Sequence, residues 1–172
     1  GTILPRRLRR HGGMPIGGMP YANLLGPKGQ VLFVAPYRTA ATSANSSAAE
    51  SSDGNPGTFL RPLKTISAAY NKCDGNRGEI IYVMGFSNTA ADVTDDWSST
   101  FTWSKSFVHL IGMVPPVAVS QRARINQLST ATGVSPLLDV TGHGNVFANF
   151  QIFQGVADAT SLINARVTGQ RN

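Results

Sequence analysis

The densest group of side chains that could do chemistry is a set of three aspartates, Asp92, Asp95 and Asp96, within five positions. Carboxylate oxygens are the ligands that calcium prefers, so one interpretation of this spacing is a calcium site. An EF-hand loop would also need an internal glycine and a closing glutamate, and neither follows here. We therefore favour a solvated polar loop over residues 86–100, in which the aspartates bond to the nearby backbone in Asx-turns.

Histidine and cysteine offer no further site. The three histidines, His11, His109 and His143, share no metal-ligand spacing, and no glutamate accompanies them in a metalloprotease pattern. His143 lies between two glycines, where a turn is expected. Cys73 is the only cysteine, which excludes an internal disulfide, and we expect it to pack as a small apolar residue. The sequence thus predicts no metal, no cofactor and no catalytic residue.

Positive charge is concentrated in residues 1–29, which contain no acid. The segment repeats Gly-Gly-Met-Pro and has little apolar surface to bury, so we expect it to be disordered when alone in water. Arginine clusters can bind nucleic acid, but the rest of the chain is nearly neutral and offers no basic face beside them. We favour contact with another protein over nucleic acid. The candidate partner-binding residues are Arg6, Arg7, Arg9, Arg10, Met14, Pro15, Met19 and Pro20.

The elements that must position these side chains lie in residues 30–172. Charged residues make up only 14% of the chain, and 18 glycines and 10 prolines favour a β-rich, turn-rich protein. No apolar run reaches the ~18 residues of a membrane span. Runs rich in β-branched and aromatic residues predict strands at 30–35, 79–85, 101–103, 107–112, 124–128, 137–141, 146–153 and 162–168.

One short helix is predicted over about residues 65–74. Thr65 can cap its N-terminus, and Gly75 is placed to end it in left-handed geometry. An apolar stripe at helical spacing gives the helix one face to bury, formed by Ile66, Ala69, Tyr70 and Cys73. Because so short a helix needs packing to be stable, we expect it to cover an open end of the β structure.

A six-residue pattern, Val140–Asn145, recurs at Val167–Asn172, which is a spacing of 27. A period in the twenties is typical of one coil of a parallel solenoid. Val140 and Val167 should then stack inside the core with parallel backbones, and Asn145 and Asn172 should stack at a corner. The second copy stops at Asn172, so we expect a further segment or another subunit to cover this end.

Three segments carry a family resemblance: residues 26–34, the Gly-Asn-Pro-Gly-Thr turn at 54–58, and residues 64–69. Together they resemble pectin-lyase-like proteins of tailed bacteriophage virions. The resemblance implies an all-β fold, a right-handed parallel β-helix (a single-stranded solenoid), of which residues 30–172 would be the N-terminal part. It also implies a capping helix over about 65–74 and an extended anchoring arm over 1–29. The resemblance further implies a homotrimer that is a structural protein of the virion. The arm would attach this protein to the capsid or to other virion proteins, where it would serve as decoration, cement or head fibre.

The same family includes tailspikes that bind or cleave host surface polysaccharide, which is the alternative function. Such hydrolysis usually takes two facing carboxylates. From Trp97 onward the chain contains two acids, Asp139 and Asp158. One period of 27 relates Asp139 to Arg166 and Asp158 to Ala131, so the two acids should not stack on one another. We expect both to have structural or turn roles.

Overall fold

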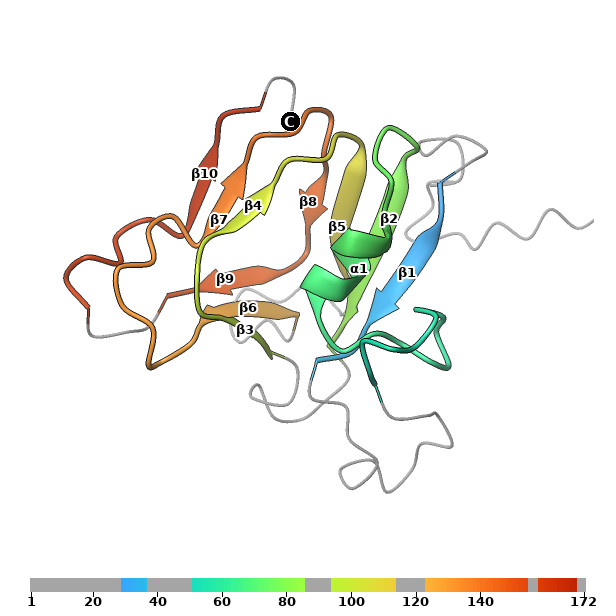
Figure 1. Cartoon of the computed structure of the whole chain (residues 1–172), viewed down its shortest axis with the longest axis horizontal. Coiled ribbons are helices and arrows are strands. Elements are labelled where there is room, and N and C mark those ends of the chain that lie inside the picture. Colours follow the sequence, from blue (N-terminus) through green and yellow to red (C-terminus); the bar gives the residue numbers. More distant parts are fainter. Residues whose placement is uncertain (1–28, 37–50, 86–93, 114–122, 155–157, 170–172) are drawn as a thin grey trace, which may run out of the picture.

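The computed structural model describes residues 29–36, 51–85, 94–113, 123–154 and 158–169. Within these ranges the chain forms one helix and ten strands (Figure 1). The helix is α1 (Ile66–Lys72). The strands are β1 (Val31–Val34), β2 (Glu79–Met84), β3 (Thr94–Trp97), β4 (Phe101–Trp103), β5 (Val108–Met113), β6 (Arg124–Gln127), β7 (Leu138–Val140), β8 (Phe147–Ala148), β9 (Gln151–Phe153) and β10 (Ala165–Val167).

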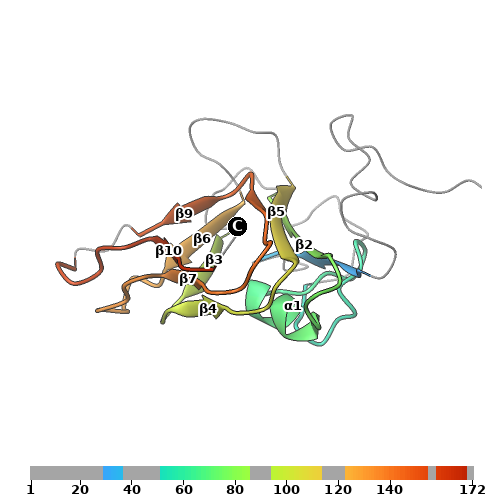
Figure 2. The same cartoon turned by 90° about the horizontal axis from the view of Figure 1, so that it is seen from above.

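The ten strands form three sheets, in the orders β1-β2-β5-β8, β3-β6-β9 and β4-β7-β10. From β2 onward the chain visits the three sheets in rotation, and each pairing between these strands is parallel. Figure 2 shows the sheet of β2 and β5 across from the other two. One core joins all three, because Leu110, Ile125 and Val140 belong to a single cluster of buried side chains.

The prediction of a right-handed parallel β-helix was wrong. The strands form three small sheets of four, three and three members, and no sheet is closed or curled. The physical reason is uneven spacing along the chain. The paired residues Leu138 and Ala165 are 27 positions apart, whereas Val31 and Ile80 are 49 apart. A fixed period is the signature of a regular solenoid, whereas these unequal connections accompany three short ladders.

The sequence repeat has a more limited structural meaning than predicted. Val140 pairs with Val167 in parallel register, which confirms the expected partner and direction. Val140 is 1% exposed but Val167 is 58% exposed, so the prediction that both lie in the core was wrong for Val167. Asn145 is buried, and its Oδ1 accepts the backbone N–H of Val108 at 2.9 Å. Asn172 lies outside the described residues.

The start of α1 is as predicted, and its end is not. Thr65 caps the helix, because its hydroxyl accepts the backbone N–H of Ala68 at 3.1 Å. The helix stops at Lys72 and is followed by an extended Cys73. Gly75 has a φ of 80° but comes after the helix has ended, so the predicted left-handed ending at this residue was wrong. The four residues of the apolar stripe are all buried.

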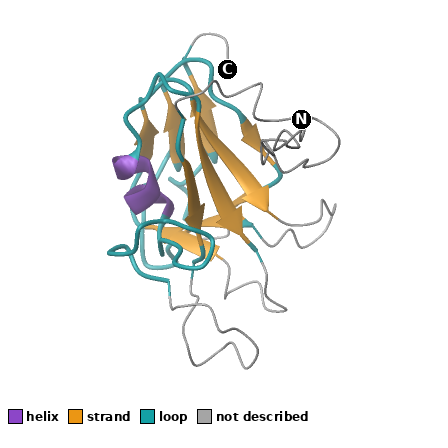
Figure 3. Ribbon diagram, turned by 90° about the vertical axis from the view of Figure 1, so that its right-hand side faces the viewer, coloured by secondary structure: helices purple, strands orange, loops and turns teal. Residues whose placement is uncertain are grey.

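The packing of α1 covers one edge of the β structure. Figure 3 shows the helix lying along one side of the strands. The ring of Tyr70 lies 5.3 Å from that of Phe101 and 4.5 Å from that of Trp103, both in β4, the first strand of its sheet. At the C-terminal end of α1, the Lys105 ammonium donates to the carbonyl oxygens of Tyr70 and Cys73 at 2.7 and 2.6 Å. A cation there also complements the helix dipole.

Two strand predictions need correction. Residues 146–153 were expected to form one strand but form β8 and β9, separated by Asn149 in a left-handed conformation with φ of 57°. Residues 86–100 were expected to be a loop, yet β3 occupies Thr94–Trp97. A strand with two adjacent aspartates is unusual in propensity and is held by its pairing with β6.

Candidate protein-interaction surface

The acidic cluster does not assemble as a calcium site in the described part of the chain. Asp95 lies in β3, buried and in register with Ile125. Its Oδ2 accepts the backbone N–H of Ile66 at 2.8 Å and so caps the first turn of α1. Burial raises the pKa of Asp95 to about 6. Asp96 instead accepts from the Asn126 amide at 2.9 Å, and Asp92 lies outside the described residues.

The raised pKa of Asp95 predicts a stability change with pH. As the pH rises, the Asp95 carboxyl loses its proton at about pH 3.9 in the unfolded chain but only at about pH 6 in the native state. The free energy of unfolding should therefore fall by about 1–2 kcal/mol as the pH rises from 4 to 6.5. In Asp95→Asn, whose amide oxygen can still accept from Ile66, this fall should disappear. Urea unfolding of both proteins across that pH range measures the difference.

The comparison of wild type with Asp95→Asn also separates this effect from other titrating groups, which both proteins share. Asp95→Leu serves as the matched control, because it removes the hydrogen-bond acceptor along with the charge. We expect Asp95→Leu to lose stability at every pH. An unchanged pH dependence in Asp95→Asn would contradict the assignment.

The other described carboxylates also bond to protein groups. Asp158 accepts from the Ser161 hydroxyl at 2.6 Å and from the backbone N–H groups of Gly133 and Thr160, and these bonds lower its pKa. This confirms the predicted turn role of Asp158. The complete set of bonded carboxylates in the described ranges is Asp53, Asp74, Glu79, Asp95, Asp96, Asp139 and Asp158.

Asp139 does not meet Asp158 but pairs with Arg166 on the neighbouring strand. The Arg166 Nε and Nη2 atoms donate to the two carboxylate oxygens of Asp139 at 3.0 and 2.7 Å. These hydrogen bonds lower the pKa of Asp139. The two residues are also in register between β7 and β10, so the predicted structural role of Asp139 is confirmed.

Sequence reasoning missed two buried polar groups. Glu79 accepts from the backbone N–H of Gly75 at 2.7 Å and from the Gln30 amide at 3.0 Å, and so fixes the turn after α1. Gln127 is buried and bonds to Gln154 at 2.7 Å. The two glutamines are 27 positions apart, so the sequence repeat could have pointed to this pair. No simple pattern would have identified Glu79.

The described histidines and the cysteine have structural contacts. The Nδ1 atom of the buried His109 accepts the backbone N–H of Val146 at 3.1 Å, and burial lowers the pKa of His109. His143 lies in a bend, as expected, while His11 is outside the described residues. Burial raises the pKa of Cys73 to about 12, which leaves an unreactive thiol. Across the described ranges, no three potential metal ligands come together.

The predicted arm cannot be placed. Its candidate residues, Arg6, Arg7, Arg9, Arg10, Met14, Pro15, Met19 and Pro20, all lie outside the described residues. No helix in the described part of the chain has the length and apolar character needed to cross a bilayer.

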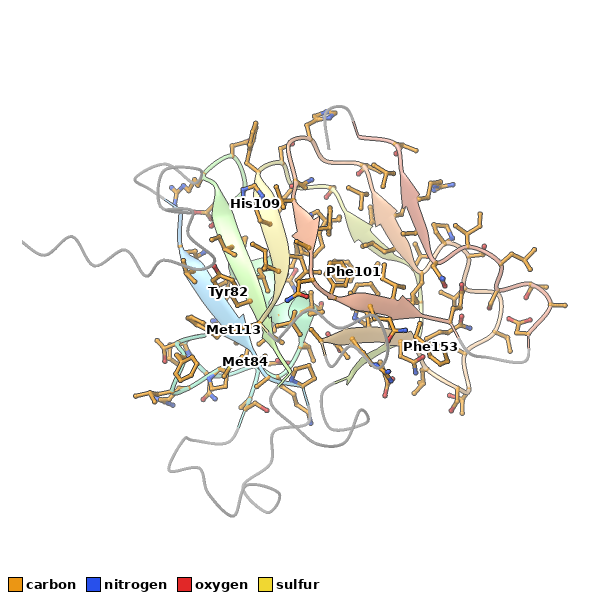
Figure 4. All side chains as sticks on the ribbon, turned by 180° about the vertical axis from the view of Figure 1, so that it is seen from behind. Tyr82, Met84, Phe101, His109, Met113 and Phe153 are labelled. Atoms are coloured by element: carbon orange, nitrogen blue, oxygen red, sulfur yellow. The ribbon has the colours of Figure 1, made fainter. Side chains whose placement is uncertain are left out.

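The described surface that is best suited to a partner lies on the last strand of the β4-β7-β10 sheet. We define the β10 edge surface as Leu162, Ile163, Ala165, Arg166 and Val167. Leu162, Ile163 and Val167 are among the exposed large hydrophobic side chains of the protein. The β3-β6-β9 sheet ends similarly, since Phe153 of β9 is 49% exposed; this residue is labelled in Figure 4. Exposed apolar side chains beside unpaired strand edges are characteristic of interaction sites.

The opposite ends of two sheets are covered. In the β1 sheet, the backbone N–H of Phe33 donates to Gly57 at 2.8 Å, and that of Ala35 donates to Leu63 at 2.8 Å. The segment before α1 therefore pairs with the outer edge of β1. In the β4 sheet, α1 packs beside the first strand through Tyr70. In these two sheets, the end strands without such cover among the described residues are therefore β8 and β10.

Comparisons of this chain with family models, with curated proteins and with solved structures gave no match.

Proposed function

We propose that this protein is a structural component of a larger assembly, and that the assembly is the virion of a tailed bacteriophage. In this role residues 1–29 attach it to the capsid or another head protein, and the folded part serves as decoration, cement or head fibre. The virion part of the proposal rests on the sequence resemblance stated above. The structural part rests on the described residues.

One observation supports the structural role. In the β4-β7-β10 sheet, the apolar side chain at one register position is buried in β4 and β7 but exposed in β10. Trp103 in β4 and Val140 in β7 are 0% and 1% exposed, and Val167, next in register, is 58% exposed. Burying a valine side chain fully is worth about 1.5–3 kcal/mol, so a partner that covers this position gains binding energy. The buried or bonded state of Glu79, Asp95 and Asp139 agrees with a scaffold, because each of these carboxylates joins separate elements of the fold.

The attachment role of the arm predicts the result of a truncation. Deleting residues 1–28 removes the arginines and Met-Pro pairs and leaves Gln30, whose amide donates to Lys72 and Glu79, in place. We expect the truncated protein to keep its circular dichroism spectrum and to lose attachment. Cosedimentation with phage particles that lack this gene product measures attachment. A truncated protein that still cosediments like the full chain would contradict this role.

A matched variant separates charge from apolar contact in the same assay. Replacing Arg6, Arg7, Arg9 and Arg10 with serine removes the cationic groups and leaves the Met-Pro pairs. If electrostatic contact dominates, this variant should attach as poorly as the truncation, and attachment of the full chain should fall with added salt. Incubation of the full chain with host surface polysaccharide tests the enzymatic alternative, and release of oligosaccharides would overturn a purely structural role.

A further inference from the structure

The contact between β5 and β8 begins with a side-chain bond in place of a backbone bond. The backbone N–H of Val146 donates to Nδ1 of His109 at 3.1 Å. In a regular parallel ladder with the observed register, this N–H would donate to the carbonyl of Val108. That carbonyl instead accepts the indole N–H of Trp103 at 3.2 Å. The His109 imidazole therefore takes the place of a backbone acceptor at the start of β8.

The bond to Val146 fixes the protonation state of His109. A neutral imidazole has one N–H and one acceptor nitrogen, so accepting at Nδ1 places the proton on Nε2. A second proton would turn Nδ1 into a donor that faces the Val146 N–H, and the bond would be lost. Burial of the ring is a further cost for the charged form, and it lowers the pKa of His109.

The described surroundings of His109 are apolar. Val108 and Leu110 point into the core cluster, so His109 lies on the opposite face of β5, which is the face seen in Figure 4. Ile80 of β2 is in register with His109 on this face and is 2% exposed. Val146 lies across from His109 on the other side. These neighbours give a protonated imidazole no compensating charge.

The titratable groups on the elements around His109 do not offset its charge either. Tyr82 lies on the same face of β2 but is in register with Ile111, and a phenol is neutral in this pH range. Glu79 lies on the opposite face, where its carboxylate accepts from the backbone N–H of Gly75. His143, in the segment before β8, is exposed in a bend. Burial is accordingly the cause of the lowered pKa of His109.

β8 has few other contacts that hold it to the sheet. It contains two residues and ends its sheet, so β5 is its one neighbour among the described strands. The N–H of Leu110 donates to the carbonyl of Val146 at 2.8 Å, and the Asn149 side-chain amide donates to the carbonyl of Gly112 at 2.9 Å. A short end strand opens at a lower free-energy cost than a central strand. Loss of the His109 bond should therefore affect β8 before the rest of the sheet.

We propose that His109 is a pH-sensitive latch, whose protonation releases the start of β8 from β5 while the other two sheets stay folded. Above about pH 6.5 the imidazole is neutral and the contact with Val146 is closed. The contact is lost as the pH falls through the folded-state pKa of His109, which lies below its ordinary value. Release makes the β5 edge accessible in response to acid. This device goes beyond the proposed attachment function and does not depend on it.

Hydrogen exchange on the 15N-labelled full chain tests the latch. NMR measures the protection factors of single amides from pH 7.5 to 4.5, after correction for the intrinsic pH dependence of exchange. We expect the protection factor of Val146 to fall at least about tenfold as the pH is lowered, because its acceptor is lost. The amide of Leu137, which donates to the Ile163 carbonyl at 3.0 Å in another sheet, should keep its protection factor.

The 15N shifts of the imidazole give an independent measurement on the same sample. They should show the Nε2–H tautomer of His109 at neutral pH, and they should titrate with the same midpoint as the amide shift of Val146. Asp95 titrates in the same range, but its protonation raises the free energy of unfolding as the pH falls, so Asp95 cannot cause a loss of protection.

Three variants separate the latch from general effects of pH. His109→Asn places an amide oxygen where Nδ1 lies and cannot be protonated, so Val146 should keep a protection factor that does not change with pH. His109→Leu has no acceptor, and we expect low protection of Val146 at every pH. His143→Asn removes the other described histidine and is the matched control, which should retain the pH dependence of the wild type.

Four results would overturn the proposal. They are a constant protection factor of Val146 in the wild type, the same loss in His109→Asn as in the wild type, an equal loss at Leu137, and different titration midpoints for His109 and Val146. The third would mean that the whole fold opens and not β8 alone. The fourth needs only the wild-type protein, so it decides the question even if His109→Asn does not fold.

Discussion

Replacing Gly112 with alanine is expected to destabilise the protein by about 3 kcal/mol or more, because the new methyl group has no space. A Cβ atom at Gly112 would overlap the carbonyl oxygen of Asn149 and lie 2.8 Å from the Cβ of Ala123. Asn149 cannot retreat easily, since its side-chain amide Nδ2 also donates to the Gly112 carbonyl at 2.9 Å. Urea unfolding followed by far-ultraviolet circular dichroism measures the loss.

Gly54→Ala is the matched control for this substitution. The nearest atom to a Cβ at Gly54 is the Ser52 hydroxyl oxygen at 3.7 Å, which is ordinary contact. We expect its free energy of unfolding to stay within about 0.5 kcal/mol of the wild type. Equal stability of the Gly112→Ala and Gly54→Ala proteins would mean that β5 and the turn at Asn149 do not approach as closely as described.

Truncation of Trp103 to alanine is the second change with a large expected effect. Trp103 is fully buried and lies between Tyr70 of α1 and Phe147 of β8, with ring centroids 4.5 and 5.3 Å away. Its indole N–H donates to the Val108 carbonyl at 3.2 Å. Removing so large a core side chain typically costs 3–5 kcal/mol through lost transfer energy and a cavity, so we expect a loss of about that size.

Two further variants show whether the loss comes from burial. Trp103→Phe keeps most of the ring volume but removes the indole N–H, and we expect it to lose about 1–2 kcal/mol. Phe153→Ala removes an aromatic ring that is half-exposed and should cost less than Trp103→Ala. If Phe153→Ala were as damaging as Trp103→Ala, the core would not be centred where we place it.

Local elements could be predicted from the sequence where composition and position agree. The apolar run Glu79–Met84 forms β2, and the Thr65 cap with its apolar stripe forms the start of α1. Thr94–Trp97 was missed because two aspartates resemble a loop, and its strand conformation depends on pairing with β6, which lies about thirty residues away in sequence. Propensity gives no access to such non-local pairing.

The arrangement of the strands was harder to predict than the strands themselves. The repeat at Val140 and Val167 identified the correct partners, but its spacing of 27 was typical of only one solenoid coil. Paired residues in β5 and β8, such as Leu110 and Phe147, are 37 positions apart instead. One repeated pair therefore could not define three sheets.

The candidate surface also could not be read from the sequence alone. Val140 and Val167 stand in the same local pattern, yet one is buried and the other exposed. The difference arises because β7 has neighbours on both sides and β10 is the end of its sheet. The same holds for the face of the β1-β2-β5-β8 sheet seen in Figure 4. Which side chains lie next to one another on it depends on the register between β2 and β5, to which the labelled residues Tyr82, Met84, His109 and Met113 belong.

The parallel pairing of all the described strands has a consequence for how the chain reaches this state. The nearest strand partners in sequence, such as Leu138 and Ala165, are 27 positions apart. Every ladder must therefore wait for a long loop to close before its contacts repay the lost chain entropy. A protein of such high contact order is expected to fold in milliseconds to seconds and not in microseconds. During that delay its apolar strands can meet those of other chains, so efficient production should favour low temperature and slow synthesis.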